Sequence, residues 1–282
     1  MHQATSRVAD LHGSLRVVGT SGLWVASASM LLPFFWMVST ALKPDGAVMV
    51  LPIQWWPSSP AWENFRRLSE SFPVGRFVLN SVIVATSGTV GQILIAAMGA
   101  YAFARLHFQG KDALFVLYLA TLMIPAQVTL IPLFVVMRFV GWVDTYQALI
   151  LPQWISPFAV FLLRQHFQTI PRQLDEAAFI DGAGHWTVFT RVLLPLARPA
   201  LGAVFIFAFM GSWNDFLWPL IVINDTNRMT LPLGLATLHG RWTSQWNLVM
   251  AGAVVAVLPI FLVFLAAQRQ FIRGLTLSAL KG

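Results

Sequence analysis

Residues that could do chemistry are few in this chain, and three carboxylates gather in one short stretch. Residues 176–184 read EAAFIDGAG and follow Asp175, so Asp175, Glu176 and Asp181 lie close to Gly182 and Gly184. Carboxylates attract a basic protein groove, and small residues let another surface come close. The stretch is therefore predicted to recognise a protein partner, and the remaining elements must hold it in place.

Catalytic motifs do not occur in the sequence. It contains no Cys, which excludes disulfides, thiolate nucleophiles and Cys-ligated metals. HExxH and GxSxG are absent, and no apolar stretch carries paired carboxylates, so a polytopic membrane enzyme is disfavoured. His166, His185 and His239 have no partners at metal-ligand spacing, and we expect no metal site.

The chain also lacks a nucleotide-binding loop of the GxxxxGK[ST] type. Gly110-Lys111 is followed by Asp112 and has no upstream glycine at the required spacing. We therefore expect this chain to bind no cofactor.

Composition predicts an all-α integral membrane protein. Of the 282 residues, 57% are hydrophobic and 10% are charged, whereas a soluble domain carries about 25% charged residues. The mean hydropathy is +0.70. The formal charge of +7 comes from Lys and Arg dispersed between apolar segments, which argues against a nucleic-acid interface.

Apolar stretches predict six transmembrane helices, because about 20 apolar residues cross a bilayer once. The stretches are 17–42, 77–104, 113–138, 145–167, 200–223 and 249–272. The first is longer than the apolar region of a signal peptide, so we take it as a retained span. The predicted organisation is an N-terminal tail 1–16, a first span 17–42, an outer loop 43–76, a core 77–272 and a C-terminal tail 273–282.

Basic residues and aromatic residues predict the orientation. Eleven of the 18 Lys and Arg residues fall on the inner side if both termini are cytosolic. The predicted outer segments 43–76 and 224–248 carry five Trp residues typical of a membrane interface. These are Trp55, Trp56, Trp62, Trp242 and Trp246.

Small and polar residues form a stripe along the second span, which predicts its packed face. The alternative, that the stripe lines a pore, is secondary. Its members are Ser81, Ala85, Gly88, Gln92, Ala96 and Gly99. Prolines within other spans are expected to kink them. These are Pro33, Pro125, Pro132, Pro152, Pro157 and Pro219.

The joint 168–199 is predicted to form a short helix, a hinge and an amphipathic helix outside the bilayer. Thr169 is expected to cap the first helix, and Gly182 to break it. The second helix is expected to begin at His185 and to end before Pro195. An interfacial segment is the alternative to a partner-binding one, but such segments are usually basic on their polar face.

EAAFIDGAGHWTVFTRVLLPLARP resembles the EAA loop of binding-protein-dependent ABC transporter permeases, the MetI-like family. The residues that match its pattern are Glu176, Ala177, Ala178, Gly182, Leu194 and Pro195. Val192 replaces the usual Ile, and Asp181 is included as a further candidate coupling residue. The resemblance implies that this loop docks as a coupling helix into a cytosolic ATPase. It further implies a second permease subunit, two ABC ATPase subunits that bind ATP and Mg, and an extracytoplasmic solute-binding protein. The implied location is the bacterial inner membrane.

Other segments resemble the sugar-uptake class of this family, in particular its maltose-permease G-type subunits. They are WENF at 62–65, GWVDTYQALILP, LLRQHFQTIP, WNDFLWPLI at 213–221 and the terminal GLTLSALKG. The resemblance implies import of a mono- or oligosaccharide by alternating access. Leu277-Ser278 replaces the more usual small pair, which weakens the expectation that the tail touches the ATPase.

Asp215 is the ionisable residue that suggests a solute path, because a charged group at membrane depth is a functional hypothesis by default. With Trp213 and Asn214 it offers the aromatic face and hydrogen-bonding groups that suit a sugar. Gln127 and Gln153 are weaker candidates. The alternative reading gives Asp215 a hydrogen bond between helices or a place near the membrane interface.

The docking loop does not encode the cargo. A permease for another solute, such as glycerol phosphate, a polyamine or an amino acid, therefore stays open. A secondary transporter is disfavoured, because the six stretches show no convincing internal repeat.

Overall fold

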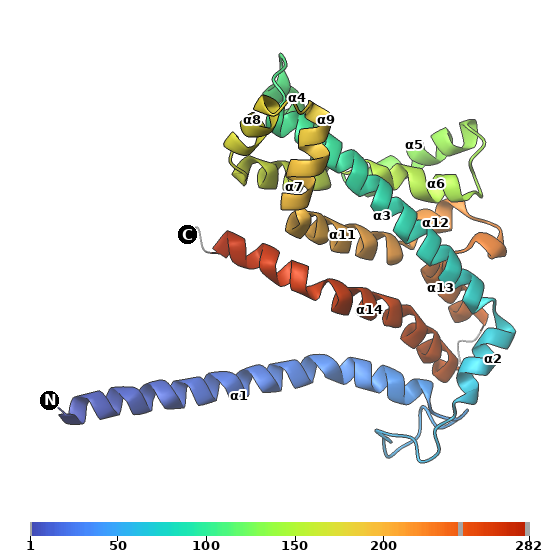
Figure 1. Ribbon diagram of the computed structural model, residues 1–282. Coiled ribbons are helices and arrows are strands. Elements are labelled where there is room, and N and C mark those ends of the chain that lie inside the picture. The colour runs from blue at the N-terminus through green and yellow to red at the C-terminus, as the bar shows by residue number, and fades with distance from the viewer. Residues whose placement is uncertain (1, 242–244, 280–282) are drawn as a thin grey trace. The chain divides into compact units, whose positions relative to one another are not determined.

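The computed structural model describes residues 2–241 and 245–279, with side chains placed for residues 20–237 and 245–265. These residues fold into helices joined by loops, without a strand among them (Figure 1). Trp242 lies outside the described residues, as do the side chains of His239, Leu277 and Ser278. The predicted class, an all-α membrane protein with six spans, is confirmed. Some apolar stretches that were predicted as single helices are broken into two or more.

The first half of the fold runs to the end of the fourth apolar stretch. Its helices are α1 (His2–Ala41), α2 (Glu63–Ser71), α3 (Val74–Arg105), α4 (Lys111–Ala120), η1 (Thr121–Met123), α5 (Ala126–Phe139), α6 (Tyr146–Ile150), η2 (Leu151–Trp154) and α7 (Pro157–Thr169).

The second half contains the joint 168–199 and the last two apolar stretches. Its helices are α8 (Gln173–Ile180), α9 (His185–Thr187), the π-helix η3 (Val188–Leu193), α10 (Leu194–Leu196), α11 (Arg198–Trp213), α12 (Leu217–Val222), η4 (Thr226–Arg228), α13 (Leu231–Arg241) and α14 (Trp246–Ala279).

Four continuous segments are long and apolar enough to cross a membrane: Thr20–Ala41, Val74–Arg105, Tyr146–Thr169 and Trp246–Leu265. Two sharply bent pairs bring the number to six if each counts as one span. The first pair joins Lys111–Met123 to Ala126–Phe139 at 99°. The bend falls at Ile124, which is extended because it precedes Pro125.

The fifth stretch departs from its prediction as one helix over 200–223. Instead, α11 ends at Trp213 and α12 begins at Leu217. The side chain of Asp215 accepts the backbone N–H of Trp218 (3.3 Å), which stabilises the start of the second helix after the break. The second bent pair, which ends where α11 ends, joins His185–Leu196 to Arg198–Trp213 at 78°.

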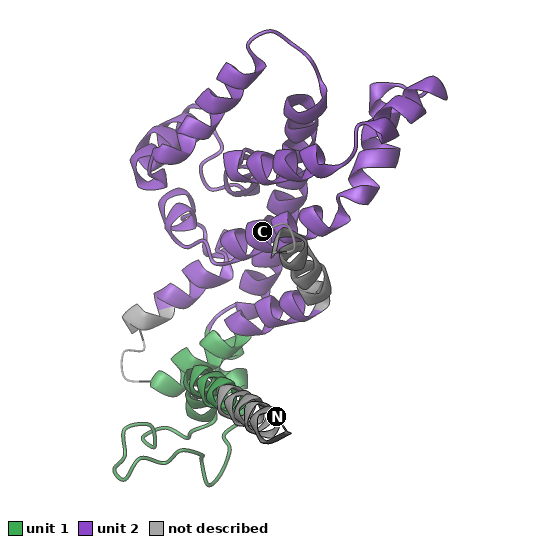
Figure 2. Cartoon of the chain, turned by 90° about the vertical axis from the view of Figure 1, so that its left-hand side faces the viewer, with its two compact units in different colours: residues 1–71, 241–255 green, residues 72–240, 256–282 purple. Residues whose placement is uncertain are grey.

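Two compact units make up the chain, residues 1–71 with 241–255 and residues 72–240 with 256–282 (Figure 2). In the first unit, helix α1 begins at His2, so residues 2–16, which were expected to form a tail, are part of this helix. Amide side chains hold its other end. Asn64 Nδ2 donates to the carbonyls of Ala41 (2.8 Å) and Lys43 (2.9 Å), and Asn247 Nδ2 donates to Asp45 (2.9 Å).

The second unit is built around α3, which packs against α7 and α11. The predicted small-residue stripe lies on this packed face: Ala85 and Ala96 are buried, and Gly88 leaves space that Gln153 fills. Gln92 also lines a hollow described below. Packing is therefore the main role of the stripe, as predicted.

The end of α3 nearest Val74 is tied to the segment that follows α12. Asn80 Nδ2 donates to the carbonyls of Asn227 (2.9 Å) and Met229 (2.8 Å). Ser81 Oγ accepts the N–H of Leu231 (2.7 Å). Side chains on α3 therefore satisfy backbone groups of a loop about 150 residues later in the chain.

Candidate coupling segment and solute path

The joint 168–199 forms the predicted helix, turn and helix, with different boundaries. Thr169 does not cap α8. It is the last residue of α7, and its hydroxyl donates to the carbonyl of His166 (2.8 Å). Ile170 is extended because Pro171 follows it, and α8 begins only at Gln173.

Gly182 ends α8 in the way a Schellman motif requires. Its φ is +85°, in the left-handed region that favours glycine. The N–H of Gly182 donates to the carbonyl of Phe179 (3.0 Å), and that of Ala183 donates to Ala178 (2.9 Å). The predicted hinge is thus a fixed turn that sets the angle between α8 and α9.

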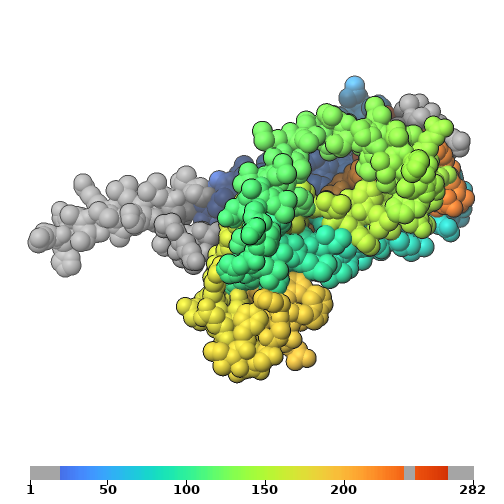
Figure 3. All heavy atoms as spheres, turned by 90° about the horizontal axis from the view of Figure 1, so that it is seen from above, coloured from blue at the N-terminus to red at the C-terminus, as the bar shows by residue number. Residues whose placement is uncertain are grey.

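The exposed side of α8 carries most of the predicted coupling residues. Glu176, Ala177, Asp181 and Gly182 are exposed, while Ala178 is half-buried against the core. Ile180 is 87% exposed, which is unusual for an isoleucine in a folded segment. Figure 3 shows the yellow atoms of this segment as a lobe beside the green atoms of the turn after α3.

Asp175 does not share that exposed side, contrary to the prediction that all three carboxylates face a partner. Its Oδ2 lies 2.7 Å from Nε of Arg105, the last residue of α3, and both side chains are buried. Burial raises the pKa of Asp175, and the positive charges of Arg105 and Arg172 oppose that rise. Two carboxylates, Glu176 and Asp181, are left to present a negative surface.

The second helix of the joint passes through Pro195 instead of ending before it. It begins at His185, as predicted, and then widens into a π-helix over Val188–Leu193. Pro195 has no N–H and would leave a carbonyl one turn back without a partner in an α-helix, which explains why the turn before it is irregular. Leu194 is half-buried and Pro195 is exposed.

Two of the five predicted path residues meet at one hollow of about 340 Å³ between α3, α7 and α11. They are Gln153 and Asp215. The residues that sequence reasoning missed there are Gln92, Ser156 and Ser212 among the polar ones, and Phe158 and Phe207 among the aromatic ones. The two aromatic rings lie edge to face with centroids 5.9 Å apart.

Trp213, Asn214 and Gln127 do not line that hollow. Trp213 is 1% exposed, and its indole N–H donates to the carbonyl of Ala256 (3.1 Å), so it packs the core. The side chain of Asn214 donates to the carbonyl of Met210 (2.9 Å). Gln127 is exposed in the first turn of α5.

The hollow offers hydrogen-bonding groups without a positive charge. Its lining contains two amides, two hydroxyls, one carboxylate and two phenyl rings, and neither Lys nor Arg. Ser212 also lines the hollow, and its Oγ is buried without a hydrogen-bond partner among the described residues. Such a mixture of phenyl rings, uncharged polar groups and one carboxylate suits a sugar.

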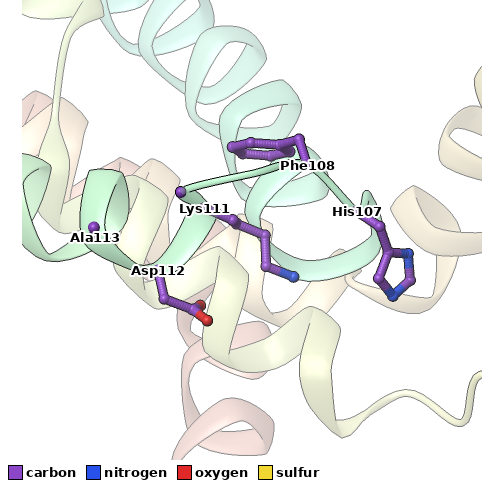
Figure 4. Close-up of a pocket in the computed structure, with 6 residues that line it drawn as sticks. His107, Phe108, Lys111, Asp112 and Ala113 are labelled. Atoms are coloured by element: carbon purple, nitrogen blue, oxygen red, sulfur yellow. The ribbon is translucent and has the colours of Figure 1, made fainter.

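A second hollow, of about 390 Å³, lies at the turn after α3 and is lined by His107, Phe108, Gly110, Lys111, Asp112 and Ala113 (Figure 4). Lys111 Nζ donates to the carbonyl of Leu106 (3.3 Å), which stabilises the end of α3. This hollow belongs to a connecting turn and is separate from the one lined by Asp215.

Histidines do not assemble a metal site among the residues whose side chains are described, where no three His, Cys, Asp or Glu residues cluster. His185 has a different partner, because its Nδ1 lies 3.0 Å from the hydroxyl of Tyr101 on α3. This pairing joins α9 to α3.

Comparison with known proteins finds similarity to membrane components of transport systems. The family described as binding-protein-dependent transport system inner membrane component matches residues 92–277. AraQ, the arabinooligosaccharides transport system permease protein of Bacillus subtilis (strain 168), is 33% identical over 270 residues, covering 95% of this chain and 96% of AraQ. UgpE, the sn-glycerol-3-phosphate transport system permease protein of Pectobacterium atrosepticum, is 35% identical over 261 residues, covering 90% and 93%.

A similar fold occurs in a bacterial ABC transporter involved in the import of the acidic polysaccharide alginate. One of its chains superposes with a TM-score of 0.81 at 21% identity, covering 90% of this chain and 95% of that one. A structure of the bacterial alginate ABC transporter in complex with an alginate pentasaccharide-bound periplasmic protein gives a TM-score of 0.62 at 15% identity.

Proposed function

This chain belongs to the family of binding-protein-dependent transport system inner membrane components, and we propose that it carries a neutral mono- or oligosaccharide. Members of this family are permease subunits of ABC importers and not enzymes. The observation that carries the choice of cargo is the hollow lined by Asp215, whose other lining groups include amides, hydroxyls and phenyl rings but neither Lys nor Arg.

The complete transporter, in this proposal, contains a second permease subunit, two cytosolic ATPases that bind ATP and Mg, and an extracytoplasmic solute-binding protein. The chain lies in the bacterial inner membrane with both termini in the cytosol, and the segment 43–76 is extracytoplasmic. ATP-driven closure of the ATPases moves the coupling segment, which switches the spans between inward-open and outward-open states. Binding of solute biases that equilibrium.

The ATPase docks on the exposed side of α8, which carries Glu176, Ala177, Asp181 and Gly182. The two carboxylates attract a basic groove, and the exposed Ile180 supplies apolar area at the centre of the contact. The end of the segment, Leu194 and Pro195, positions it relative to α11.

Docking is tested by Glu176→Lys and Gly182→Pro in the full complex. Both variants are expected to insert normally, to lose uptake and to co-purify with less ATPase. Gln168→Lys is the matched control, because it adds a charge to an exposed residue near the end of α7, outside α8, without removing a carboxylate. Normal ATP-coupled uptake in the two test variants would exclude this docking surface.

Glycerol phosphate is the second candidate cargo, because UgpE is 35% identical to this chain. Its phosphate would meet the Asp215 carboxylate in a hollow without Lys or Arg, which is repulsive at short range. Reconstitution of the transporter with its native partners separates the two. A neutral oligosaccharide is expected to stimulate ATP hydrolysis, and stimulation by glycerol phosphate alone would reverse the assignment.

A further inference from the structure

The coupling segment is attached to one end of α3 at two separate points. Arg105 Nε lies 2.7 Å from Asp175 Oδ2 on α8, and the two side chains are only 6% and 9% exposed. Arg105 Nη2 also donates to the carbonyl of Ile170 (2.9 Å), in the connection that leads into α8. One guanidinium therefore holds both the start of the segment and its first helix.

The second attachment comes from Tyr101, one helical turn earlier on α3. Its hydroxyl lies 3.0 Å from Nδ1 of His185, the first residue of α9. Its ring packs against Phe189 with centroids 5.3 Å apart. The helices on both sides of the Gly182 turn are thus joined to the same part of α3.

The Arg105–Asp175 pair is a costly way to hold two helices together if stability alone is considered. Burying both charges removes them from water, and neither Asp175 Oδ1 nor Arg105 Nε has a hydrogen-bond partner among the described residues, so the pair is held by charge attraction. Apolar side chains of similar volume often stabilise a fold as well or better. A buried ion pair does fix one arrangement, because shifting it leaves an unpaired charge.

Helix α3 is suited to transmit a displacement along its length. It runs without an internal proline from Val74 to Arg105, about 48 Å at 1.5 Å per residue. At its other end, Asn80 and Ser81 bind the backbone of residues 227–231. One rigid element therefore joins the coupling segment to the loop after α12, as Figure 1 shows for α3, α8 and α12.

We propose that Arg105 and Asp175 are positioning residues that make α8 and α3 move as one body, so that displacement of the coupling segment reaches the opposite end of α3. The proposal rests on the docking of an ATPase on α8 described above. The pair itself does not contact the ATPase. It determines how much of the ATPase motion becomes helix motion.

Transport per ATP is the quantity that tests this role, measured in proteoliposomes with the complete transporter. Asp175→Asn and Arg105→Gln are expected to keep ATPase co-purification normal and to lower the solute carried per ATP hydrolysed by about fivefold or more. The double variant Arg105→Gln/Asp175→Asn is expected to recover part of this loss, because two amides can hydrogen-bond and no buried charge is left unpaired.

Asp112→Asn is the matched control, because Asp112 pairs with Arg164 at 3.8 Å on the same side of the fold but is 85% exposed. An exposed ion pair contributes little free energy to the contact between two helices, so transport per ATP in Asp112→Asn is expected to equal that of the parent. An unchanged ratio in Asp175→Asn overturns the proposal. So does a loss of assembled complex that accounts for all of the lost uptake, since that would be a purely structural effect.

Distances between spin labels test the rigid-body movement directly. The chain has no native cysteine, so labels at Gln109→Cys and Gln173→Cys report only on the turn after α3 and the start of α8, provided that the partners are cysteine-free. The distance is expected to be equal in nucleotide-free and ATP-trapped complexes, and to differ between them in Asp175→Asn. A change in the parent contradicts the proposal. Failure of docking is recognised separately, because Glu176→Lys would then leave ATPase association unchanged.

Discussion

At the scale of single residues, similar side chains serve different roles according to their environment. Glu176 and Asp175 are adjacent in sequence, yet Glu176 is exposed and Asp175 is buried against Arg105. Asp215 both caps the start of α12 and lines a hollow, so one carboxylate carries both the structural and the solute-path interpretation. Experiments on these residues must therefore separate binding from folding.

Asp215→Asn tests the solute path and keeps the size and the backbone hydrogen bond of the side chain. Uptake of a neutral sugar is expected to fall, because a neutral amide accepts weaker hydrogen bonds than a carboxylate. Discrimination against anionic solutes is expected to relax as the negative charge is removed. Competition assays with neutral and anionic solutes measure both effects.

Asn214→Ser is a useful control for that experiment, because Asn214 directly precedes Asp215, does not line the hollow, and serine keeps a hydrogen-bond donor for the carbonyl of Met210. It is expected to leave the cargo preference as in the parent. Unchanged rate and selectivity in Asp215→Asn would remove Asp215 from the path and leave its capping role.

Gly182→Ala is expected to weaken coupling, because a Cβ at a φ of +85° costs about 1–2 kcal/mol. Relieving that strain rotates α9 away from α8 and reduces ATP-coupled uptake. Gly184→Ala is the matched control in the same turn, since Gly184 has an extended backbone and open space around it. Equal uptake rates in the two variants would show that the turn does not set the geometry.

At the scale of elements, α3 organises the second unit. Its small residues admit neighbouring side chains, and its two ends bind segments far away in sequence. Close packing in a membrane depends on such small residues, because lipid tails give helices no hydrophobic reason to associate. A single added methyl group on this face therefore matters more than it would on an exposed face.

Gly91→Ala is expected to destabilise the packing of α3 on η2. A Cβ at residue 91 would collide with the indole of Trp154, whose N–H donates to the carbonyl of Ser87 (3.2 Å). Displacing the ring breaks that hydrogen bond and opens the contact, with a loss of about 1–3 kcal/mol. The melting temperature of the purified complex measures the effect.

Gly75→Ala in the same helix has no neighbour within 4 Å of the added carbon, and its melting temperature is expected to stay close to that of the parent. If both variants melt at the same temperature, the Gly91 contact does not support the fold.

At the scale of the whole molecule, single cysteines test the proposed orientation, because the parent chain has none. Ser58→Cys lies in the exposed loop after α1, and Gln109→Cys lies in the exposed turn after α3. An impermeant maleimide is expected to label residue 58 in cells with a permeabilised outer envelope and residue 109 only after the inner membrane is opened. The reverse pattern would invert the topology.

Local patterns predicted most of the fold. Apolar runs gave the spans, and the spacing of EAAFIDGAG gave the helix and turn around Gly182. Breaks were harder to predict, because Pro125 bends its span while Pro132 remains inside α5. The site was predicted only in part, because the partner of Asp175 is 70 residues earlier in the chain and the lining of the Asp215 hollow comes from α3, η2, α7, α11 and the connections beside them.

Separation along α3 has a consequence for how such a protein changes during evolution. Gln92 lines the hollow and Arg105 holds the coupling segment, about 20 Å apart along the same helix. If the hollow carries the solute and α8 docks the ATPase, as we propose, substitutions that adapt the chain to a different cargo can accumulate around Gln92, Gln153 and Asp215. The contacts between α3 and the coupling segment would then stay unchanged. Related permeases that share an ATPase could come to transport different solutes in this way. The same separation could be used to engineer the uptake of a chosen solute.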